Sequence, residues 1–511
     1  MPSVTWWTAY ACYAVGIAAV ARQINVEVQE PYMDEIFHVP QAQAYCRGDW
    51  RYWDPALTTP PGLYLLPAAI SHLQRVGLAY HPSWLFTSDP CSLSSLRSFN
   101  LCLSLALPFL YRSILALLLR PSPSPKPSSA APAEQSMSAT RDWEALTLTL
   151  FPLAGWWSWL YYTDLGSLVL VLLAWRAGLQ GRWVSSAAWG AQSLLFRQTN
   201  IVWLLFIAGQ GAVNSVKRRS PHGVYDPPLT FTPASALLRT PLSLLSSALL
   251  HPRAFLPVLA PYSLVFGAAG AFVKWNGGVV LGDKANHVAT LHVPQVYYFV
   301  LFACGFFVAP LLSSLGMKGL VKHTFGLVRG PRQVALTAMA LGGMCWSIGR
   351  FAIAHPFLLA DNRHYAFYLW RRLINVHPLA RYALTPVYLL GAKVLYAGLA
   401  HSRLMTLSTL LLFLCALVGV LVPTPLLEPR YFITALLILR LYLSPPPSLS
   451  SQRRRRVALA AEAALYIAVQ AVCVYLFLRK TFVWDVRVGE DGKGLEGRDE
   501  REVGRLQRFM W

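Results

Sequence analysis

The chain carries little charge and few of the motifs that mark metal or redox chemistry. Only 13% of its 511 residues are charged and 55% are apolar, which excludes an ordinary soluble protein. The eight cysteines form no CxxC pair and show no metal-ligand spacing, and no Asn-x-Ser/Thr glycosylation acceptor occurs. There is no DxD pair either, which argues against a nucleotide sugar held through a divalent cation.

Apolar runs recur along the whole chain and predict an all-α polytopic membrane protein. Each run is roughly long enough for a membrane helix, and together they indicate roughly 12–13 crossings. The first run lacks a basic n-region and a cleavage site, so we expect it to be retained. The runs are 4–21, 98–119, 144–162, 165–181, 184–196, 201–214, 254–274, 295–315, 334–354, 381–400, 404–424, 431–444 and 457–478.

Basic residues concentrate in short segments between the apolar runs. The net charge is +21, and the Lys/Arg clusters at 217–219, 318–332 and 453–456 fall on one side if the runs alternate across the membrane. Cytoplasmic loops are enriched in Lys and Arg, so that side is expected to be the cytosol. Contact with anionic lipid is the alternative reading of these clusters.

The runs and loops suggest six successive segments. Residues 1–120 hold the first helix, a polar loop and the second helix, and 121–142 is a low-complexity linker. Residues 143–214 form further helices, 215–253 a cytosolic loop, and 254–478 the remaining helices. The charged tail over 479–511 is lumenal if the number of crossings is odd.

The polar motifs all fall at the ends of the runs opposite to the basic clusters. This asymmetry predicts one membrane-embedded active site facing away from the cytosol, formed by the loops on that side. The motifs are Pro31 to Tyr64, Tyr161 to Asp164, Phe196 to Asn200, Gly282 to His287 with His292 and Gln295, His355 to Arg372, and Leu427 to Tyr431.

Together these motifs resemble the eukaryotic dolichyl-phosphate-glucose-dependent α-1,2-glucosyltransferases of the endoplasmic reticulum. The resemblance implies a GT-C type fold with its site facing the lumen. It also implies transfer of the terminal, third glucose from dolichyl phosphate glucose to a dolichyl-diphosphate-linked oligosaccharide with inversion, without a cofactor or nucleic acid. The matching blocks are MDEIFHVPQAQAYC, WDPALTTPPGLY, YYTDLGS, FRQTNIVW, GDKANHVATLHVPQVYYF, HPFLLADNRHYAFYLWRR and LEPRYF.

Such a reaction needs one carboxylate base, and Asp34 and Glu35 are the catalytic candidates. A carboxylate is ionised at neutral pH, and both residues follow the first apolar run. Consecutive helical side chains diverge by about 100°, so we expect Asp34 to be the base and Glu35 to orient or hydrogen-bond. Asp164 is a further candidate for the base. Alternatively, the two acids only cap a helix after Pro31.

The leaving dolichyl phosphate calls for fixed positive charge, which arginine supplies with a planar fork. The alternative is that each of these cations forms an ion pair within the protein, with Asp361, Glu428 or Asp283 as partner. The candidates for binding the donor phosphate are Arg363, His364, Arg430, Arg197 and Lys284.

Further polar and aromatic residues of the same blocks are candidates for binding the substrates. Their histidines lack the spacing of a metal motif, so we predict no metal. Cys46 and Cys91 share a predicted lumenal loop and can pair. A transporter or another lipid-sugar transferase is the competing function. The binding candidates are His38, Gln41, Trp53, Asp54, Thr58, Thr59, Tyr162, Asp164, Asn286, His287, Asp361, Asn362 and Tyr365.

Overall fold

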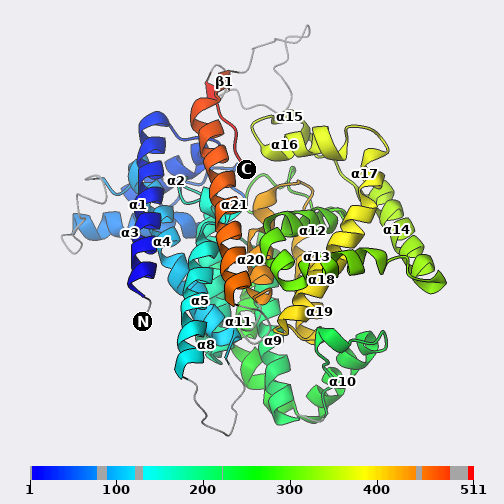
Figure 1. Cartoon of the computed structure of the whole chain (residues 1–511). Helices are drawn as coiled ribbons and strands as arrows, with labels where there is room; N and C mark the ends of the chain where they lie inside the picture. The colour runs from blue at the N-terminus through cyan, green and yellow to red at the C-terminus, as the bar shows by residue number, and fades with distance from the viewer. Residues whose placement is uncertain (1–2, 77–88, 121–130, 221–222, 445–451, 484–504) are drawn as a thin grey trace. The chain divides into compact units, whose positions relative to one another are not determined.

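A computed structural model describes residues 3–76, 89–120, 131–220, 223–444, 452–483 and 505–511 (Figure 1). Helices make up its regular structure in these ranges, apart from one antiparallel pair of short strands, β1 (Phe482–Val483) and β2 (Leu506–Gln507). The chain divides into two compact units. Unit 1 comprises Met1–His287, Ser402–Ala416 and Leu441–Gln452, and unit 2 comprises Val288–His401, Leu417–Arg440 and Arg453–Trp511.

Unit 1 contains the first helices of the chain. They are α1 (Val4–Glu27), α2 (Glu35–Arg47), α3 (Gly62–Arg75), α4 (Leu93–Leu118), α5 (Ala131–Thr149), α6 (Pro152–Trp156), α7 (Thr163–Leu179), α8 (Trp183–Leu194), α9 (Asn200–Arg219), η1 (Leu229–Phe231), α10 (Ala236–Leu250) and α11 (Pro252–Asn276).

Most of the remaining helices lie in unit 2, and two of them, α19 (Leu407–Leu421) and α20 (Ile433–Tyr442), run from one unit into the other. The others are α12 (Gln295–Phe306), α13 (Val308–Phe325), α14 (Pro331–Phe351), α15 (Pro356–Ala360), α16 (Tyr365–Leu369), the π-helical turn η2 (Trp370–Ile374), α17 (Ala380–Ala383), α18 (Thr385–Ser402), η3 (Pro429–Phe432) and α21 (Gln452–Arg479).

Six helical segments in the described ranges are long and apolar enough to cross a membrane, which confirms a polytopic membrane protein. They are α1, α4, α11, α14, α17 with α18, and α21. The expected run 295–315 is instead two helices, α12 and α13, bent by 81°. The run 144–162 is interrupted where α5 ends at Thr149 and Pro152 starts α6, because proline cannot continue a helix. The count of roughly 12–13 crossings stays a prediction.

Helices occupy part of the segments expected to be a linker and a loop, and the division into six segments stays a prediction. Residues 121–130 lie outside the described ranges, but α5 begins at Ala131 and so occupies the end of the linker predicted over 121–142. The loop predicted over 215–253 contains α10. The charged tail is described at its two ends, where β1 and β2 pair, while 484–504 lies outside the description.

The described part of the polar stretch between α1 and α4 is folded around a core that it shares with α4 and the Tyr161 loop. Helices α2 and α3 pack through a cluster of buried side chains that includes Val39, Tyr45, Leu63 and Tyr64. A disulfide joins Cys46 at the end of α2 to Cys91 just before α4. This stretch therefore holds its residues in fixed positions.

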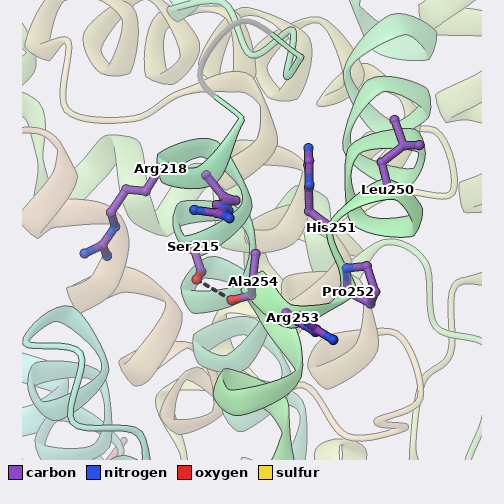
Figure 2. Close-up of a pocket in the computed structure, with 8 residues that line it drawn as sticks. Ser215, Arg218, Leu250, His251, Pro252, Arg253 and Ala254 are labelled. Atoms are coloured by element: carbon purple, nitrogen blue, oxygen red, sulfur yellow. Dashed lines mark hydrogen bonds between the residues drawn. The ribbon is translucent and has the colours of Figure 1, made fainter.

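A cavity of about 680 Å³ opens at the other end of unit 1 (Figure 2). The last turn of α9 and the junction between α10 and α11 line it. The Phe196–Asn200 motif lies at the start of α9 and the cavity at its end, so the length of the helix, about 30 Å at about 1.5 Å per residue, separates them.

We predict that replacing Cys46 and Cys91 together by Ser lowers the free energy of unfolding by about 4 kcal/mol, because the bond closes a long loop and restricts the unfolded chain. The apparent melting temperature of the purified protein in detergent measures this. Replacing the exposed free cysteines Cys12 and Cys415 by Ser is the matched control and should leave it unchanged. A double variant that melts like the wild type contradicts the prediction.

Candidate active site

Glu35 is the buried centre of the polar stretch. Its side chain has no exposed surface, and Arg97 of α4 donates to both carboxylate oxygens, over 2.9 Å from Nε to Oε1 and 2.6 Å from Nη2 to Oε2. The backbone N–H of Tyr161 donates to Oε1 at 2.7 Å, and that of Tyr32 to Oε2 at 3.1 Å. Both oxygens of Glu35 are therefore occupied by donors of the protein itself.

Arg97 uses its whole guanidinium group in this arrangement. Besides Glu35 it donates from Nη1 to the carbonyl of Val28 at 2.7 Å and to Asn25 Oδ1 at 3.1 Å, and from Nη2 to the carbonyl of Glu30 at 3.3 Å. A guanidinium has five N–H donors in a rigid fork. The Glu35–Arg97 pair thereby ties the end of α1, the start of α2, α4 and the Tyr161 loop together.

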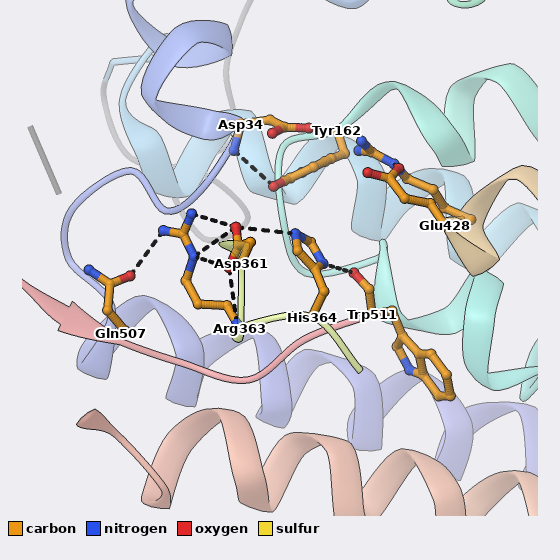
Figure 3. Close-up of polar contacts among 9 residues, drawn as sticks. Asp34, Tyr162, Asp361, Arg363, His364, Glu428, Gln507 and Trp511 are labelled. Atoms are coloured by element: carbon orange, nitrogen blue, oxygen red, sulfur yellow. Dashed lines mark hydrogen bonds and ion pairs between the residues drawn. The ribbon is translucent and has the colours of Figure 1, made fainter. Parts of the chain in front are cut away.

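Asp34 lies directly beside this pair, at the start of α2. Met33 before it has φ of 55°, in the left-handed region that non-glycine residues rarely adopt. The backbone N–H of Asp34 donates to the hydroxyl of Tyr162 at 3.0 Å (Figure 3). Asp34 is the N-cap residue of α2, and its half-buried side chain makes no capping hydrogen bond to the helix.

His38 and Gln41, on the first turns of α2, hold neighbouring segments. His38 Nδ1 lies 2.7 Å from the Tyr64 hydroxyl. Gln41 is fully buried; its Nε2 donates to the carbonyl of Tyr52 at 2.9 Å, and its Oε1 accepts the N–H of Asp54 at 3.0 Å. Gln41 therefore fixes the backbone on both sides of Trp53, whose ring lies 6.3 Å from that of Tyr64.

The segment from Asp54 to Thr59 is bound by backbone hydrogen bonds to the Gly282–His287 motif. The N–H of Gly282 donates to Leu57 O and that of Asp283 to Pro55 O, both at 3.0 Å. A Cβ on residue 282 would lie 2.2 Å from the oxygen of Pro55, so only glycine fits this close approach. Asp283 itself has φ of 39°.

Thr58 and Thr59 lie within that contact. Thr58 O accepts Nε2 of Gln198 at 2.7 Å, which brings the Phe196–Asn200 motif to the same place. The buried hydroxyl of Thr59 has no hydrogen-bond partner among the described residues.

The second acid considered as base, Asp164, lies in the first turn of α7 and is buried. Its Oδ1 accepts Nη2 of Arg197 at 2.8 Å. Asn100 of α4 donates to the carbonyls of Leu160 and Tyr162 at 2.7 and 2.9 Å and so holds the Tyr161–Asp164 motif in place. Asp164 and Arg197 therefore pair with each other in unit 1.

Lys284 does not pair with Asp283, contrary to the ion-pair alternative for it. Its Nζ donates to the carbonyl of Asn276, the last residue of α11, at 2.5 Å. Asp283 instead accepts Asn286 Nδ2 at 2.9 Å and lies 3.4 Å from His287 Nδ1. Lys284 thus caps a helix C-terminus, where a cation is favoured.

In unit 2, Asp361 holds Arg363 (Figure 3). Nε and Nη2 of Arg363 donate to Asp361 at 2.9 and 2.7 Å, and Nη1 donates to Gln507 Oε1 at 3.0 Å. Burial alone would raise the pKa of Asp361, but the hydrogen bond from Arg363 and the charge of His364 lower it below its usual value. The pair therefore stabilises the fold above the unfolded pKa of about 3.9, and this contribution is lost only as the pH falls through the lower folded pKa.

Residues 505–511 bind the same motif. Met510 accepts the N–H of Tyr365 at 3.0 Å and donates its own N–H to Arg363 O at 2.9 Å. His364 Nδ1 lies 2.9 Å from Trp511 O (Figure 3). Asn362 lies between Asp361 and Arg363 in this turn. The motif over 361–365 is thus held by the end of the described chain.

In the Leu427–Tyr431 motif, Arg430 pairs with Glu428, which lies two residues earlier. Asp361 and Arg363 have the same spacing. Gln295 donates to the carbonyls of Thr424 and Leu426 and fixes the approach to the Leu427–Tyr431 motif. Burial lowers the pKa of His292 to about 4, so His292 is neutral at physiological pH and supplies no positive charge.

The structure therefore groups the predicted residues by unit. Asp361, Asn362, Arg363, His364, Tyr365 and Arg430 belong to unit 2, and the other predicted residues belong to unit 1. No group of three or more potential metal ligands is found in the part of the chain that the structure describes.

Sequence reasoning missed Arg97, Asn100 and Gln507. Arg97 and Asn100 were detectable, because a charged or amide side chain at the edge of an apolar run normally has a partner inside the protein. Gln507 offered no such signal, since it lies in the charged tail.

Comparison with known proteins gives a consistent family. Residues 28–441 match the model of the DIE2/ALG10 family. A protein of Arabidopsis thaliana is 34% identical to this chain, and the match covers 96% of both chains. A protein of Rattus norvegicus is 35% identical and one of Homo sapiens is 32% identical, and each of these matches covers 95% of this chain and 94% of the relative. Each bears the name Dol-P-Glc:Glc(2)Man(9)GlcNAc(2)-PP-Dol alpha-1,2-glucosyltransferase. No solved structure matches.

We predict that Glu35→Gln destabilises the protein by about 3–5 kcal/mol, because it leaves the guanidinium of Arg97 buried without a counter-charge. Thermal unfolding in detergent measures the loss. The double variant Glu35→Gln/Arg97→Met should melt closer to the wild type than Glu35→Gln alone, since it removes both charges. Equal melting temperatures for Glu35→Gln and the wild type would show that the pair has no structural role.

Proposed function

We propose that Asp34 is the general base of this chain, which belongs to the DIE2/ALG10 family and is an α-1,2-glucosyltransferase. It takes glucose from dolichyl phosphate glucose and adds it to the diglucosylated oligosaccharide on dolichyl diphosphate, the reaction for which its relatives are named. In this reaction Asp34 accepts the proton of the attacking sugar hydroxyl. The bond from the anomeric carbon to the phosphate oxygen breaks, and dolichyl phosphate leaves with the electron pair.

One carboxylate is enough for this chemistry. Inversion is a single displacement, and the leaving phosphate is already a stable anion that needs no acid to protonate it. Glu35 and Asp164 are both buried and each is bonded to an arginine, whereas Asp34 is only half-buried and so is the more accessible carboxylate, which supports assigning the proton transfer to Asp34.

The observation that carries the assignment is the Glu35–Arg97 pair. It fixes the residues on both sides of Asp34, since Tyr32 N–H binds the Glu35 carboxylate across the left-handed Met33. A base held in position reacts without reorganising first. Glu35 is thus proposed as a positioning residue.

Positive charge for the donor phosphate is assigned to Arg363, with His364, and to Arg430. Both arginines are held by a carboxylate two residues earlier, and an oriented guanidinium suits a phosphate better than a mobile one. Arg197, which Asp164 holds in the same way, stays a further candidate in unit 1, whereas Lys284 caps α11.

Contacts to the sugars are assigned to the segment bound to the Gly282–His287 motif. Trp53 offers an apolar surface for a pyranose ring. The candidates in unit 1 are His38, Gln41, Trp53, Asp54, Thr58, Thr59, Tyr162, Asn286 and His287, and those in unit 2 are Asp361, Asn362 and Tyr365.

We place the chain in the endoplasmic reticulum membrane with the Asp34 side facing the lumen. The Cys46–Cys91 disulfide supports this, because disulfides persist in oxidising compartments. The basic residues at the opposite end of α9 fit the cytosolic side.

Asp34→Asn should abolish glucose transfer, a loss of at least about 100-fold expected for a general base, while the melting temperature stays near that of the wild type. Transfer of radiolabelled glucose from dolichyl phosphate glucose by the purified protein measures it. Asp49→Asn, which changes an exposed acid of the same stretch outside the candidate site, is the control and should lose far less. Wild-type turnover by Asp34→Asn would exclude Asp34 as the base.

The substrate step is tested with defined acceptors that carry zero, one, two or three glucoses. We expect product from the diglucosylated acceptor only. Product from a mannose-only acceptor would place the chain at another transfer step while leaving the base assignment open to the Asp34 variant.

Arg363→Gln should raise the KM for dolichyl phosphate glucose about tenfold or more and change the KM for the acceptor little, because one charge-assisted phosphate contact is worth about 1.5–3 kcal/mol. Steady-state kinetics with each substrate varied measures the split. Arg371→Gln removes an exposed arginine of the same block and is the control. Equal rises in both KM values would contradict a donor-phosphate role.

A further inference from the structure

Helix α10 exposes its apolar face, whereas a surface helix of a soluble protein buries that face. Its leucine stripe consists of Leu238, Leu242, Leu245 and Leu249, which are 71%, 64%, 58% and 74% exposed. Their spacing of three or four residues puts them on one helix face.

The face of α10 that is buried against the protein is small and partly polar. Its buried residues are Ala236, Thr240 and Ser247. Ser243, which is partly buried, accepts the N–H of Tyr225 at 2.9 Å. A helix that buries hydroxyl groups and presents leucines outward is suited to lie in lipid.

The α9–α11 cavity begins where α10 ends (Figure 2). Leu250 and His251 follow the leucine stripe directly and line this cavity, together with Arg218, Arg219 and Arg253. These three arginines are exposed and form no ion pair with any acid in the described parts of the chain. The leucine stripe of α10 therefore borders directly on the arginine-lined cavity.

Neighbouring charges leave the positive character of the cavity intact. The nearby Lys217 is bound to Asp226 at 2.7 Å, which neutralises that acid. The first turn of α11 has no side-chain cap at His251, so its N–H groups add partial positive charge at the same place.

Topology and helix capping explain only part of this arrangement. Basic residues at the end of α9 suit both the helix dipole and a cytoplasmic loop. Neither reason accounts for a leucine stripe on α10 that continues into the basic cavity. A phospholipid has both chemistries in the same order, with acyl chains next to a charged phosphate.

We propose that the α9–α11 cavity binds the head group of an anionic phospholipid, with its phosphate on Arg218, Arg219 and Arg253 and its acyl chains along the leucine stripe of α10. The site lies at the end of α9 remote from the Phe196–Asn200 motif, so it is separate from glucose transfer.

Native mass spectrometry of the purified full chain with phosphatidylserine or phosphatidylcholine tests the proposal. We expect phosphatidylserine to be retained preferentially, and Arg218→Gln/Arg219→Gln/Arg253→Gln to weaken its binding about tenfold or more. The matched control Arg47→Gln/Arg51→Gln/Arg75→Gln removes the same charge from exposed residues between α1 and α4, outside the basic clusters, and should bind as the wild type does. Equal weakening by both triple variants, or by neither, overturns the proposal.

Further variants separate the site from misfolding and from free phosphate. Replacing the three arginines by Lys should restore most of the binding, and all variants should melt alike without lipid. Leu238→Ser/Leu242→Ser/Leu245→Ser should also weaken retention of phosphatidylserine, whereas Phe231→Ser, which changes an exposed residue outside α10, should not. Displacement of phosphatidylserine by an equal concentration of inorganic phosphate would show a free phosphate site and overturn the lipid assignment.

Discussion

The buried pair of Glu35 and Arg97 is the constraint on which the rest of unit 1 depends. Transferring two charges out of water costs several kcal/mol per ion, and only complete hydrogen bonding offsets that cost. Here all five N–H donors of Arg97 and both oxygens of Glu35 are satisfied, by each other, by the side chain of Asn25 and by backbone groups of neighbouring segments. A buried ion pair of this kind is stable only in a geometry that satisfies all of its hydrogen-bonding groups. It therefore fixes where α1, α2, α4 and the Tyr161 loop meet, and with them the left-handed Met33 and the start of α2 at Asp34.

The same physical device recurs at the other motifs. Arg197 is held by Asp164, Arg363 by Asp361 and Arg430 by Glu428, so most of the charges that mark the motifs in the sequence are used in pairs that orient loops. For Arg363 and Arg430 this is the ion-pair alternative that the sequence left open, and it does not remove them from phosphate chemistry, because a guanidinium fixed on one edge can still present another. For Lys284 the expected partner was wrong, since the end of α11 offers carbonyl groups closer than Asp283 does.

The sequence predicted the chemistry-bearing motifs better than the helices between them. The polar motifs were recognisable because carboxylates, arginines and amides stand out against apolar runs, and the four motifs that lie in unit 1 do contact one another. Breaks in helices were harder to predict. The run 295–315 is uniformly apolar, yet it bends by 81° between α12 and α13, and a hydropathy profile does not detect such a bend. Arg97 was overlooked because it was counted as the edge of a membrane run. The contacts of Gln507 and Trp511 with Arg363 and His364 join residues over 140 positions apart, and no local pattern encodes them.

Helix α9 carries two different sets of polar residues, one at each end. At its start, Asn200 is buried and bonded to Ser167 and to the carbonyl of Ser193, which anchors the Phe196–Asn200 motif. At its end, the consecutive arginines Arg218 and Arg219 line the cavity beside α10. A helix of this length is about 30 Å long, so the two ends lie far apart within unit 1. Rigid, fully bonded polar groups at one end suit a site that must hold substrates in a fixed geometry. Exposed arginines next to outward-facing leucines at the other end suit a fluid partner that imposes no geometry of its own, and a lipid is such a partner.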